Sequence, residues 1–372
     1  MSKRPIEGEQ QVFMTGNEVV AWAALAAGAE IMYGYPITPQ NEIMHYWTRL
    51  APRFGRKFLQ TEDELSAGFS TIGGVLAGKK AFSATSGPGT VLFQEPLSMA
   101  EMMRLPVVVV IQQRGGPSTA TVIYSQQEVV LAAFGGNGEG LRIVYSTSSH
   151  QELYDYTLKA FDVAWRYRFP TFVLGDGYQA QMREALTIYD PADRNLNLQP
   201  AEPFLGGEGR PGSDRPPVHM RNAFSVEEEL YDILMQIIKA YEEITPKLVE
   251  FESGLNDDAE LTIIAHGIVS RSVKEAVEIL RRQGVHVGYF RPITLRPFPR
   301  EALCQAVQNA GSILIVESAY GQLARLTLEA LGTRFIKHWE TYSRPGMGIT
   351  AEELVEKVNS MEFASKKLEA KS

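Results

Sequence analysis

The feature that most constrains the fold is an alternation of short apolar runs with longer helix-like segments, which occurs in two separate blocks. The first block begins near Gly16 and contains the strand-like runs "EIMYGY", "KKAFSAT" and "LPVVVVIQQ". The second begins at Leu261 and contains three strand-and-helix repeats. Strands that alternate with helices are typical of parallel sheets covered by helices. The pattern therefore predicts an α/β protein, with a small doubly wound sheet in its second block.

The segment between the blocks, residues 190–221, is rich in proline, glycine and charge and has no apolar period. It is predicted to be a linker or a long surface loop. A helix follows, for which Ser225 and Glu228 are the expected capping box. Its apolar residues recur every three or four positions, so we expect it to pack back onto a domain. These residues are Leu230, Ile233, Leu234, Ile237, Ile238 and Tyr241.

This organisation predicts three regions. They are an α/β domain at residues 12–190, a linker with its connecting helix at 191–258, and a second α/β domain at 259–360.

Charge and hydropathy narrow the class of protein. The 372 residues carry a formal net charge of -8, whereas nucleic-acid binding relies on clustered Lys and Arg. No run approaches the roughly 20 apolar residues of a membrane-spanning helix. The N-terminus also lacks the apolar stretch of a signal peptide. We therefore expect a cytoplasmic protein that binds neither nucleic acid nor membrane.

The metal-ligating side chains are sparse. Cys304 is the single cysteine, and its apolar helical surroundings predict a buried filler rather than a reactive thiol. One cysteine cannot by itself ligate an iron–sulfur cluster. The six histidines show no metal-ligand spacing, so this chain is expected to hold no metal site of its own.

The stretch "EDELSAGFSTIGG", residues 62–74, places three acids at the head of a segment of small residues. Acids in the first turn of a helix each contribute about 0.3–1 kcal/mol through the helix dipole, so the acids alone require no chemistry. Small residues also let another backbone or a flat ligand approach the helix closely. They are Ala67, Gly68, Ser70, Gly73 and Gly74.

This segment resembles the pyrimidine-binding domain of thiamine diphosphate enzymes, in which a glutamate heads such a helix and "TSGPG" follows the next strand. The resemblance implies that Glu64 is the catalytic carboxyl that hydrogen-bonds the pyrimidine ring. Desolvation should raise the pKa of that carboxyl, with Glu62 and Asp63 as its solvated neighbours. The other residues assigned to the cofactor are Thr85, Ser86, Gly87, Pro88 and Gly89.

A wider resemblance appears because "GNEVVAWAALAAG", "YPITP", "EDELSAG", "TSGPGT" and "QRGGPST" occur in this order. Over residues 12 to 360 the chain resembles the α subunit of 2-oxoacid:ferredoxin oxidoreductases and is most similar to the 2-oxoglutarate branch. The resemblance implies thiamine-dependent oxidative decarboxylation of 2-oxoglutarate to succinyl-CoA, with electrons passed to ferredoxin. Pyruvate or a branched-chain 2-oxoacid remains an alternative substrate, since no residue that reads a distal carboxylate is identified. A non-catalytic assembly module is the alternative from another class.

The same resemblance assigns Thr38 and Arg114 to the 2-oxoacid. A guanidinium suits this task, because its planar fork gives a carboxylate two parallel hydrogen bonds. The structural alternative for Arg114 is a salt bridge at a strand end. For Thr38 it is capping of the following helix.

The motif "GDGYQAQ", residues 175–181, with Asn195 or Asn197 downstream, resembles a magnesium and diphosphate signature. We reject this interpretation, because the spacing is short and the asparagines fall in the proline-rich segment. The family resemblance instead implies a β subunit that supplies the Mg²⁺ and diphosphate site and a [4Fe-4S] cluster. Coenzyme A is the implied co-substrate and ferredoxin the electron acceptor. Small γ and δ subunits and a dimer of heterodimers fit the same pattern.

The second block resembles the transketolase C-terminal domain, which is mainly architectural. Arg291 and Arg296 could contact coenzyme A phosphates, but we favour interface or strand-end salt bridges for them. His266 is expected to be a packed strand-end residue rather than a base. The segment "AFGGNGEGLR", residues 133–142, is either part of a substrate or coenzyme A pocket or a solvated loop.

Overall fold

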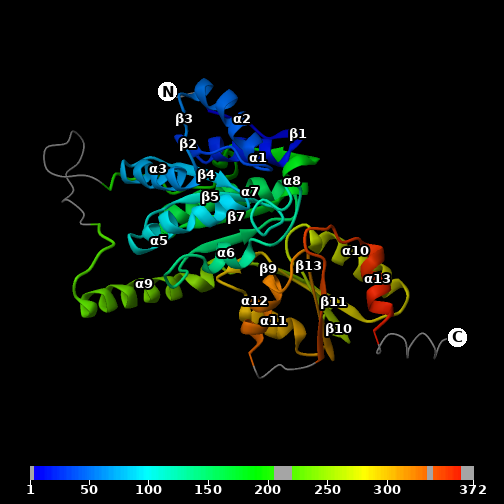
Figure 1. Ribbon diagram of the computed structural model, residues 1–372. Coiled ribbons are helices and arrows are strands. Elements are labelled where there is room, and N and C mark those ends of the chain that lie inside the picture. Colours follow the sequence, from blue (N-terminus) through cyan, green and yellow to red (C-terminus); the bar gives the residue numbers. More distant parts are fainter. Residues whose placement is uncertain (1–3, 205–219, 333–337, 362–372) are drawn as a thin grey trace, which may run out of the picture.

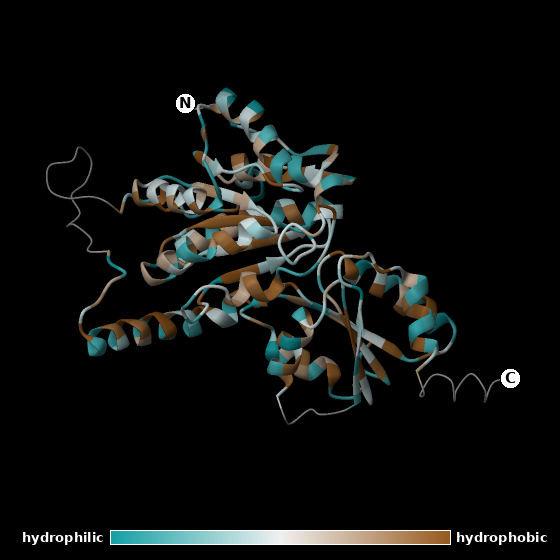
Figure 2. Ribbon diagram, in the orientation of Figure 1, coloured by the Kyte–Doolittle hydropathy of each residue, from teal (hydrophilic) through white to brown (hydrophobic). Residues whose placement is uncertain are grey.

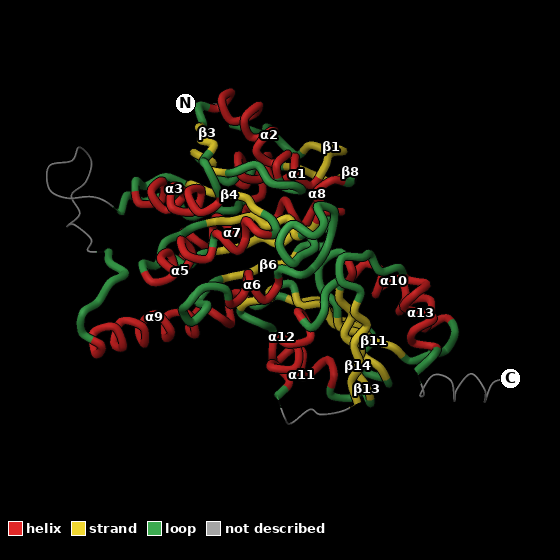
Figure 3. The backbone as a smooth tube through the Cα atoms, viewed as in Figure 1, coloured by secondary structure: helices red, strands yellow, loops and turns green. Residues whose placement is uncertain are grey.

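The computed structural model describes residues 4–204, 220–332 and 338–361. Two α/β units lie side by side, and helix α9 (Glu227–Leu248) runs along the edge of the first (Figure 1). Loops gather in the region where the two units meet (Figure 3). Among the described residues, no helix combines the length and the apolar character that crossing a membrane requires.

The first unit is built on a seven-stranded sheet of order β12-β6-β7-β5-β4-β2-β3. All neighbouring strands are parallel except β12, which pairs antiparallel with β6 and comes from the second block of the sequence. Strands β4, β5 and β7 are buried throughout, as expected for a sheet with helices on both faces. The strands are β2 (Ile31–Gly34), β3 (Lys57–Gln60), β4 (Ala81–Thr85), β5 (Val108–Gln113), β6 (Ile143–Ser146), β7 (Thr171–Asp176) and β12 (Thr294–Arg296).

Helices cover this sheet on two sides, and the alternation within β5 shows how. Val108 and Val110 pack with one group of helices, whereas Val109 and Ile111 pack with the other, because successive strand residues face opposite ways. Figure 2 shows the resulting apolar strands between more polar outer surfaces. The first group is α1 (Gly16–Ala26), α2 (Asn41–Leu50) and α7 (His150–Tyr167); the second is α3 (Glu64–Leu76), α5 (Gln94–Met102) and α6 (Val129–Phe134).

The second unit contains a five-stranded sheet of order β14-β13-β10-β11-β9, in which only β9 is antiparallel to its neighbour. Helices lie on both faces, so the predicted doubly wound arrangement is confirmed. The strands are β9 (Phe251–Gly254), β10 (Leu261–Ile264), β11 (Val287–Pro292), β13 (Ser312–Glu317) and β14 (His338–Ser343). The helices are α10 (Val269–Arg282) and α13 (Ala351–Asn359) on one face and α11 (Arg300–Val307) and α12 (Gln322–Leu331) on the other.

Short elements complete the first unit. Strands β1 (Gln10–Thr15) and β8 (Arg183–Ile188) form a two-stranded antiparallel sheet. The remaining helices are α4 (Pro88–Leu92), α8 (Gly177–Gln181) and two 3₁₀ turns at Ala51–Phe54 and Pro191–Arg194. Much of the predicted linker, residues 205–219, lies outside the described residues.

Helix α9 departs from the sequence prediction at its start. The N-cap residue is Val226, which has no side chain able to cap, so the expected capping box of Ser225 and Glu228 is wrong. The apolar face packs back from Ile233 onward, and Ile237, Tyr241 and Leu248 are buried. Leu230 in the first turn remains 36% exposed, because the helix projects past the edge of the first unit there (Figure 1).

Candidate functional site

Helix α3 begins at Glu64 because Asp63 caps it. The Asp63 carboxylate accepts a hydrogen bond from the backbone N–H of Ser66 at 2.6 Å, and this bond lowers the pKa of Asp63. Asp63 therefore has a local structural task, which the sequence analysis did not assign to it. Glu62 is exposed, as expected.

The Glu64 side chain turns inward, and only 5% of it is exposed. Burial raises the pKa of the Glu64 carboxyl, in agreement with the sequence prediction, and the negative charge of Asp63 adds to this effect. A backbone hydrogen bond and the charge of Arg114 act in the opposite direction. A carboxyl with a raised pKa is suited to hold or exchange a proton near neutral pH.

The small residues of α3 serve packing within the chain. A Cβ on Gly68 would lie 2.9 Å from Pro96 Cβ at the start of α5. A Cβ on Gly74 would lie 2.8 Å from Ala81 Cβ of β4 and 2.9 Å from the Tyr33 ring. The close neighbours of Gly68 and Gly74 are therefore α5 and the sheet.

The "TSGPG" turn follows β4 and meets Glu64. Gly87 adopts φ +54°, a conformation that favours glycine, and Pro88 opens helix α4. A Cβ on Gly89 would lie 2.6 Å from Glu64 Oε1 and would also collide with Thr85 Oγ1. The turn thus packs against the Glu64 carboxyl with no room for a side chain at residue 89.

The two hydroxyl residues of this turn differ in their contacts. Ser86 Oγ donates a hydrogen bond to the carbonyl of Gln112 at 2.6 Å, which fixes the turn to strand β5. Thr85 Oγ1 is buried and finds no hydrogen-bond partner among the described residues. A buried hydroxyl without a partner is costly, so Thr85 is the one of the pair that remains available to a ligand.

Arg114 follows β5 and reaches the loop that carries Thr38. Its Nη1 donates a hydrogen bond to the Thr38 carbonyl at 2.7 Å, and only 4% of the residue is exposed. Its buried Nε has no partner among the described residues, and a Cβ on Gly87 would lie 2.5 Å from that atom. In the described part of the chain Arg114 forms no ion pair within 4 Å, so the strand-end salt bridge is not seen there.

Thr38 lies in the loop between β2 and α2, with an exposed side chain. Helix α2 begins at Asn41 with Gln40 as its N-cap residue, so capping by Thr38 is excluded. Asn17 Nδ2 donates to the carbonyl of Pro39 at 2.7 Å and holds the loop against α1. The structure therefore brings Thr38 and Arg114 together, through a main-chain contact of the threonine.

Glu128 is a central residue of the site that the sequence analysis missed. Its buried carboxylate accepts hydrogen bonds from the backbone N–H of Arg114 at 2.9 Å and from the Thr90 hydroxyl. The backbone N–H of Gly87 also bonds to it, while burial raises its pKa. One side chain thus connects the "TSGPG" turn with the Arg114 loop. Its donors are mainly backbone N–H groups, which leave no pattern in a sequence.

Comparison with protein-family models decides the family. Residues 22–247 match the model described as pyruvate flavodoxin/ferredoxin oxidoreductase, thiamine diphosphate-binding. The chain belongs to this oxidoreductase family. Residues 259–352 match core domain II of pyruvate:ferredoxin oxidoreductase, which agrees with the resemblance noted for both blocks.

Two curated relatives of this oxidoreductase have different names but the same sequence identity to it. The 2-oxoglutarate synthase subunit KorA of Methanothermobacter marburgensis is 34% identical over 346 residues, covering 84% of this chain and 89% of the relative. The ketoisovalerate oxidoreductase subunit VorB of Methanothermobacter thermautotrophicus is 34% identical over 323 residues, with 87% and 90% covered.

Solved structures confirm the fold of the oxidoreductase chain. A 2-oxoglutarate:ferredoxin oxidoreductase from Magnetococcus marinus, with 2-oxoglutarate, coenzyme A and succinyl-CoA bound, matches with a TM-score of 0.83 and 26% identity. The match covers 94% of this chain and 65% of that one. A split-gene transketolase, an inactive β4 tetramer, matches with a TM-score of 0.56 and 14% identity over 93% and 97% of the two chains, which supports the likeness in fold alone.

The site of this oxidoreductase suits a thiamine cofactor on chemical grounds. The buried Glu64 carboxyl can pair with a ring nitrogen, and the unpartnered Thr85 hydroxyl can bond a further polar atom. The unpartnered Nε of Arg114 is a cationic donor for a carboxylate.

The "GDG" motif has local roles in the family fold. The Asp176 carboxylate caps helix α8 by accepting a hydrogen bond from the backbone N–H of Gln179 at 3.0 Å. Burial raises the pKa of Asp176 to about 7. Asn195 ends the 3₁₀ turn at Pro191–Arg194 with φ +55°. Asp176 and Asn195 therefore each have a local structural role.

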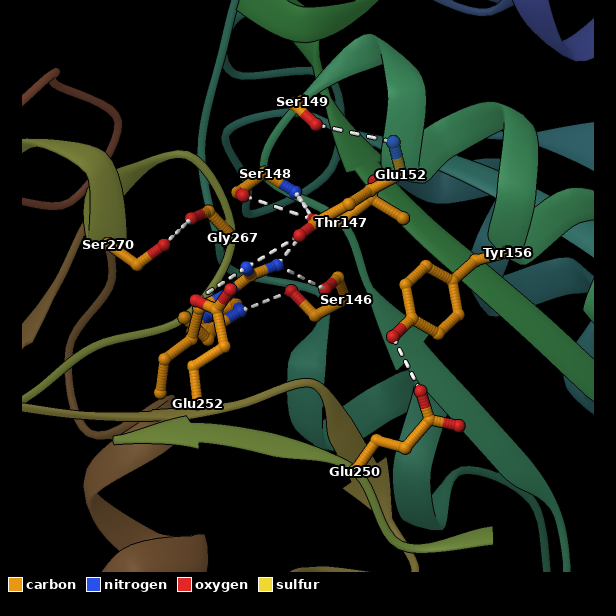
Figure 4. A network of polar contacts seen from close by, with 12 residues as sticks. Ser146, Thr147, Ser148, Ser149, Glu152, Tyr156, Glu250, Glu252, Gly267 and Ser270 are labelled. Atoms are coloured by element: carbon orange, nitrogen blue, oxygen red, sulfur yellow. Dashed lines mark hydrogen bonds and ion pairs between the residues drawn. The ribbon is translucent and has the colours of Figure 1, made fainter. Parts of the chain in front are cut away.

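Arg291 joins the two units of the oxidoreductase chain. Only 1% of it is exposed, and its guanidinium bonds both oxygens of Glu152, at 2.7 Å and 2.5 Å, and Glu252 at 3.1 Å. Figure 4 labels these two acids. The predicted interface salt bridge is confirmed. His266 is also packed as predicted, because it is fully buried with Nδ1 2.9 Å from Ser146 Oγ.

Arg296 forms a different contact from the one predicted. Its Nε donates to the carbonyl of Gly140 at 2.9 Å, so it holds the 133–142 segment through a main-chain acceptor instead of a salt bridge. Arg142 Nη2 donates to the carbonyl of Gly135 at 2.7 Å at the other end of this segment. Residues 136–139 are exposed between these anchors, and Asn137, Gly138 and Glu139 line a surface pocket together with residues of α5 and α9.

Proposed function

We propose that this chain is the α subunit of a 2-oxoglutarate:ferredoxin oxidoreductase that uses thiamine diphosphate. The observation that carries the proposal is the placement of Glu64, a buried carboxyl against the "TSGPG" turn, close enough to the substrate-loop Arg114 for the two charges to interact. Family membership and the KorA relatives support the choice of cofactor and substrate.

The proposed reaction breaks the bond between C1 and C2 of 2-oxoglutarate and releases C1 as carbon dioxide. The remaining acyl group loses two electrons, which two ferredoxins accept, and the coenzyme A thiol takes the acyl group with loss of its proton. The products are succinyl-CoA, carbon dioxide and two reduced ferredoxins.

Glu64 acts in this proposal as the catalytic carboxyl that hydrogen-bonds the cofactor's pyrimidine ring. When bound, thiamine diphosphate supplies the nucleophilic carbon and the electron sink of the decarboxylation. The raised pKa of Glu64 favours a proton on the carboxyl at the position of the ring nitrogen. Thr85 offers its free hydroxyl, Gly87 and Pro88 shape the turn, and Ser86 fixes that turn to β5.

Arg114 and Thr38 bind the 2-oxoacid in this proposal. The Arg114 guanidinium has an unpartnered Nε, so part of its fork can bond the carboxylate that leaves. The Thr38 hydroxyl is exposed next to it, while the Thr38 carbonyl orients the guanidinium. Fixing the carboxylate determines which carbon–carbon bond lies in the reactive orientation.

A β subunit is proposed to complete the site with Mg²⁺, the diphosphate-binding residues and a [4Fe-4S] cluster. The chain's single cysteine and the capping role of Asp176 leave these tasks to a partner. Two exposed apolar residues follow the segments that form the site. Val91, on α4 after the "TSGPG" turn, is 58% exposed, and Ile123, after the Arg114 loop, is 60% exposed. Burial of such residues would drive association.

The assembly proposed from the family pattern is a cytoplasmic dimer of heterodimers that reduces ferredoxin, to which small γ and δ subunits can add. Within the chain, residues 12–190 form the pyrimidine-binding domain and residues 191–258 the connecting region. Residues 259–360 form the unit that resembles the transketolase C-terminal domain.

The proposal is tested by purifying the chain with its co-expressed β subunit and measuring ferredoxin reduction with coenzyme A and one 2-oxoacid at a time. We expect the highest kcat/KM with 2-oxoglutarate. A higher value with a branched-chain 2-oxoacid would favour the alternative that the VorB relatives raise, and a higher value with pyruvate would favour that substrate. Full turnover by this chain alone would refute the shared site, and no turnover by any complex would favour the assembly module.

A further inference from the structure

The segment Ser125–Glu128 follows the Arg114 loop and enters the contact between the two units. Gln126 is buried, and its amide Nε2 donates to the carbonyl of His266 at 2.9 Å. Its Oε1 accepts from the backbone N–H of Ser318 at 3.0 Å, and its own backbone N–H donates to the Ser318 carbonyl at 3.0 Å. Main-chain atoms of the second unit therefore satisfy both ends of this side chain.

The next two residues point to the candidate site instead. Gln127 Oε1 accepts a hydrogen bond from the backbone N–H of Gly116 at 2.9 Å, and Glu128 Oε1 accepts one from the backbone N–H of Arg114 at 2.9 Å. Glu128 also bonds the Thr90 hydroxyl behind the "TSGPG" turn. Three consecutive residues thus link the second unit to the loop that carries Arg114.

The Gln126 side chain lies close to the main chain of the second unit. Gly267 adopts φ +57°, and a Cβ on this residue would lie 2.9 Å from Gln126 Nε2. The strand end at His266 and the turn at Ser318 therefore present their main chains directly to Gln126. Such contacts fix the position of the segment, because main-chain atoms held by strands β10 and β13 move little.

We propose that Gln126 is a positioning residue through which the second unit sets the Arg114 loop, acting by way of Gln127 and Glu128. This inference rests on the proposed function for the role of Arg114. It gives the second unit a part in substrate binding beyond the architectural one predicted from the sequence. Without Gln126, the segment loses its link to His266 and to the Ser318 N–H, and the bonds to Arg114 and Gly116 become less well held.

The first test needs no activity. We expect Gln126→Ala in the full-length chain to speed amide hydrogen exchange at Arg114 and Gly116 by about tenfold, the effect of losing one net hydrogen bond. Exchange within β5 at Val109 and Val110 should stay unchanged. Equal exchange at Arg114 and Gly116 in the variant and the parent protein would overturn the proposal.

A matched control breaks another contact between the same units. Tyr156→Phe removes the hydrogen bond from the Tyr156 hydroxyl to Glu250 Oε2, 2.6 Å long, which does not involve the Ser125–Glu128 segment (Figure 4). We expect no faster exchange at Arg114 or Gly116 in this variant. Equal acceleration there would show general loosening of the interface and would also overturn the proposal.

The second test uses the complex with the β subunit. Gln126→Ala should raise the KM for the 2-oxoacid by about tenfold and leave kcat within about twofold, since the chemistry at Glu64 is untouched. Gln126→Met keeps the length of the side chain without its hydrogen bonds, so it should behave like Gln126→Ala and serves if the alanine variant folds poorly. A methionine variant with parental KM would overturn the role of the hydrogen bonds. Lack of turnover in the parental complex would instead count against the proposed function and leave the exchange result standing.

Discussion

Gly89 lies so close to Glu64 that a Cβ atom on residue 89 would stand 2.6 Å from Glu64 Oε1. Gly89→Ala is therefore expected to displace the Glu64 side chain and to lower kcat/KM of the complex by at least about tenfold. Overpacking of this kind should cost about 1–3 kcal/mol of stability, so the chain should still fold. Ferredoxin reduction and thermal unfolding measure the two effects.

Gly73→Ala is the matched control, because Gly73 lies on α3, the helix that carries Glu64, is exposed, and has open space around its Cβ position. Alanine should stabilise α3 there by about 1 kcal/mol without affecting turnover. Normal turnover in Gly89→Ala would show that residue 89 does not fix the Glu64 carboxyl.

Glu64→Gln tests the catalytic carboxyl itself. The amide is close to the carboxyl in shape but cannot exchange a proton, so decarboxylation in the assembled complex should fall by about 10²–10⁴-fold. The complex should remain intact in size-exclusion chromatography, because the substitution keeps the volume of a largely buried residue. Near-normal turnover would remove Glu64 from the mechanism.

Arg114→Ala tests substrate binding. Loss of a charge-assisted hydrogen bond worth about 1.5–3 kcal/mol should raise the KM for the 2-oxoacid by about ten- to a hundredfold. The Arg114 backbone N–H bond to Glu128 is retained in the variant, so the loop should keep its position. Unchanged steady-state kinetics would disprove the assigned contact.

The sequence predicted those parts of the fold that follow an apolar pattern. Strand β5 was recognisable because "VVVVIQQ" is apolar almost throughout, as a strand buried on both faces must be. Strand β14, "HWETYS", lies at the edge of its sheet, is mostly polar and has no buried residue, so it gave no such signal. Strand β12 has three residues and joins the sheet of the other unit, a pairing that no local pattern encodes.

The candidate site was predictable where side chains carry the chemistry and not where main-chain atoms do. Glu64 and Arg114 were found from their residue types and motifs. Glu128 and Gln126 were not, because nearly all their partners are backbone N–H and carbonyl groups from distant segments. The contact between Arg114 and the Thr38 carbonyl was not predicted, because a main-chain acceptor leaves no pattern in a sequence.

Arg291→Ala should destabilise the contact between the units. The substitution leaves Glu152 without its cationic partner and should lower the free energy of unfolding by about 2–3 kcal/mol. This value is at or below the low end for buried ion pairs, because Glu152 is partly exposed. Arg282→Ala is the control, since its pair with Glu278 is exposed and contributes about 0–0.5 kcal/mol. Urea unfolding of both variants measures the difference, and equal midpoints would contradict the prediction.

The ion pair of Arg291 with Glu152 should also make the stability of the folded protein depend on pH in the acid range. Burial raises the pKa of Glu152, but hydrogen bonds from Arg291 overcome this effect, so its pKa in the folded protein lies below the ordinary value. The stabilisation is therefore fully present above about pH 4.3, the unfolded pKa of a glutamate, and is lost as the pH falls through the lowered folded pKa. Glu152→Gln should remove this part of the acid sensitivity in unfolding experiments below pH 5.

Because of His266, the free energy of unfolding should also depend on pH in a higher pH range. Burial, followed by the charge of Arg291, lowers the pKa of His266 to about 3, whereas an unfolded histidine titrates near 6.5. Between these values the unfolded chain binds the extra proton, so the free energy of unfolding should fall by up to about 1.4 kcal/mol for each pH unit below 6.5. His266→Asn keeps a polar atom for Ser146 but cannot titrate, so its stability should vary less between pH 7 and 5 than that of the parent protein. Equal slopes for His266→Asn and the parent would contradict a neutral buried His266.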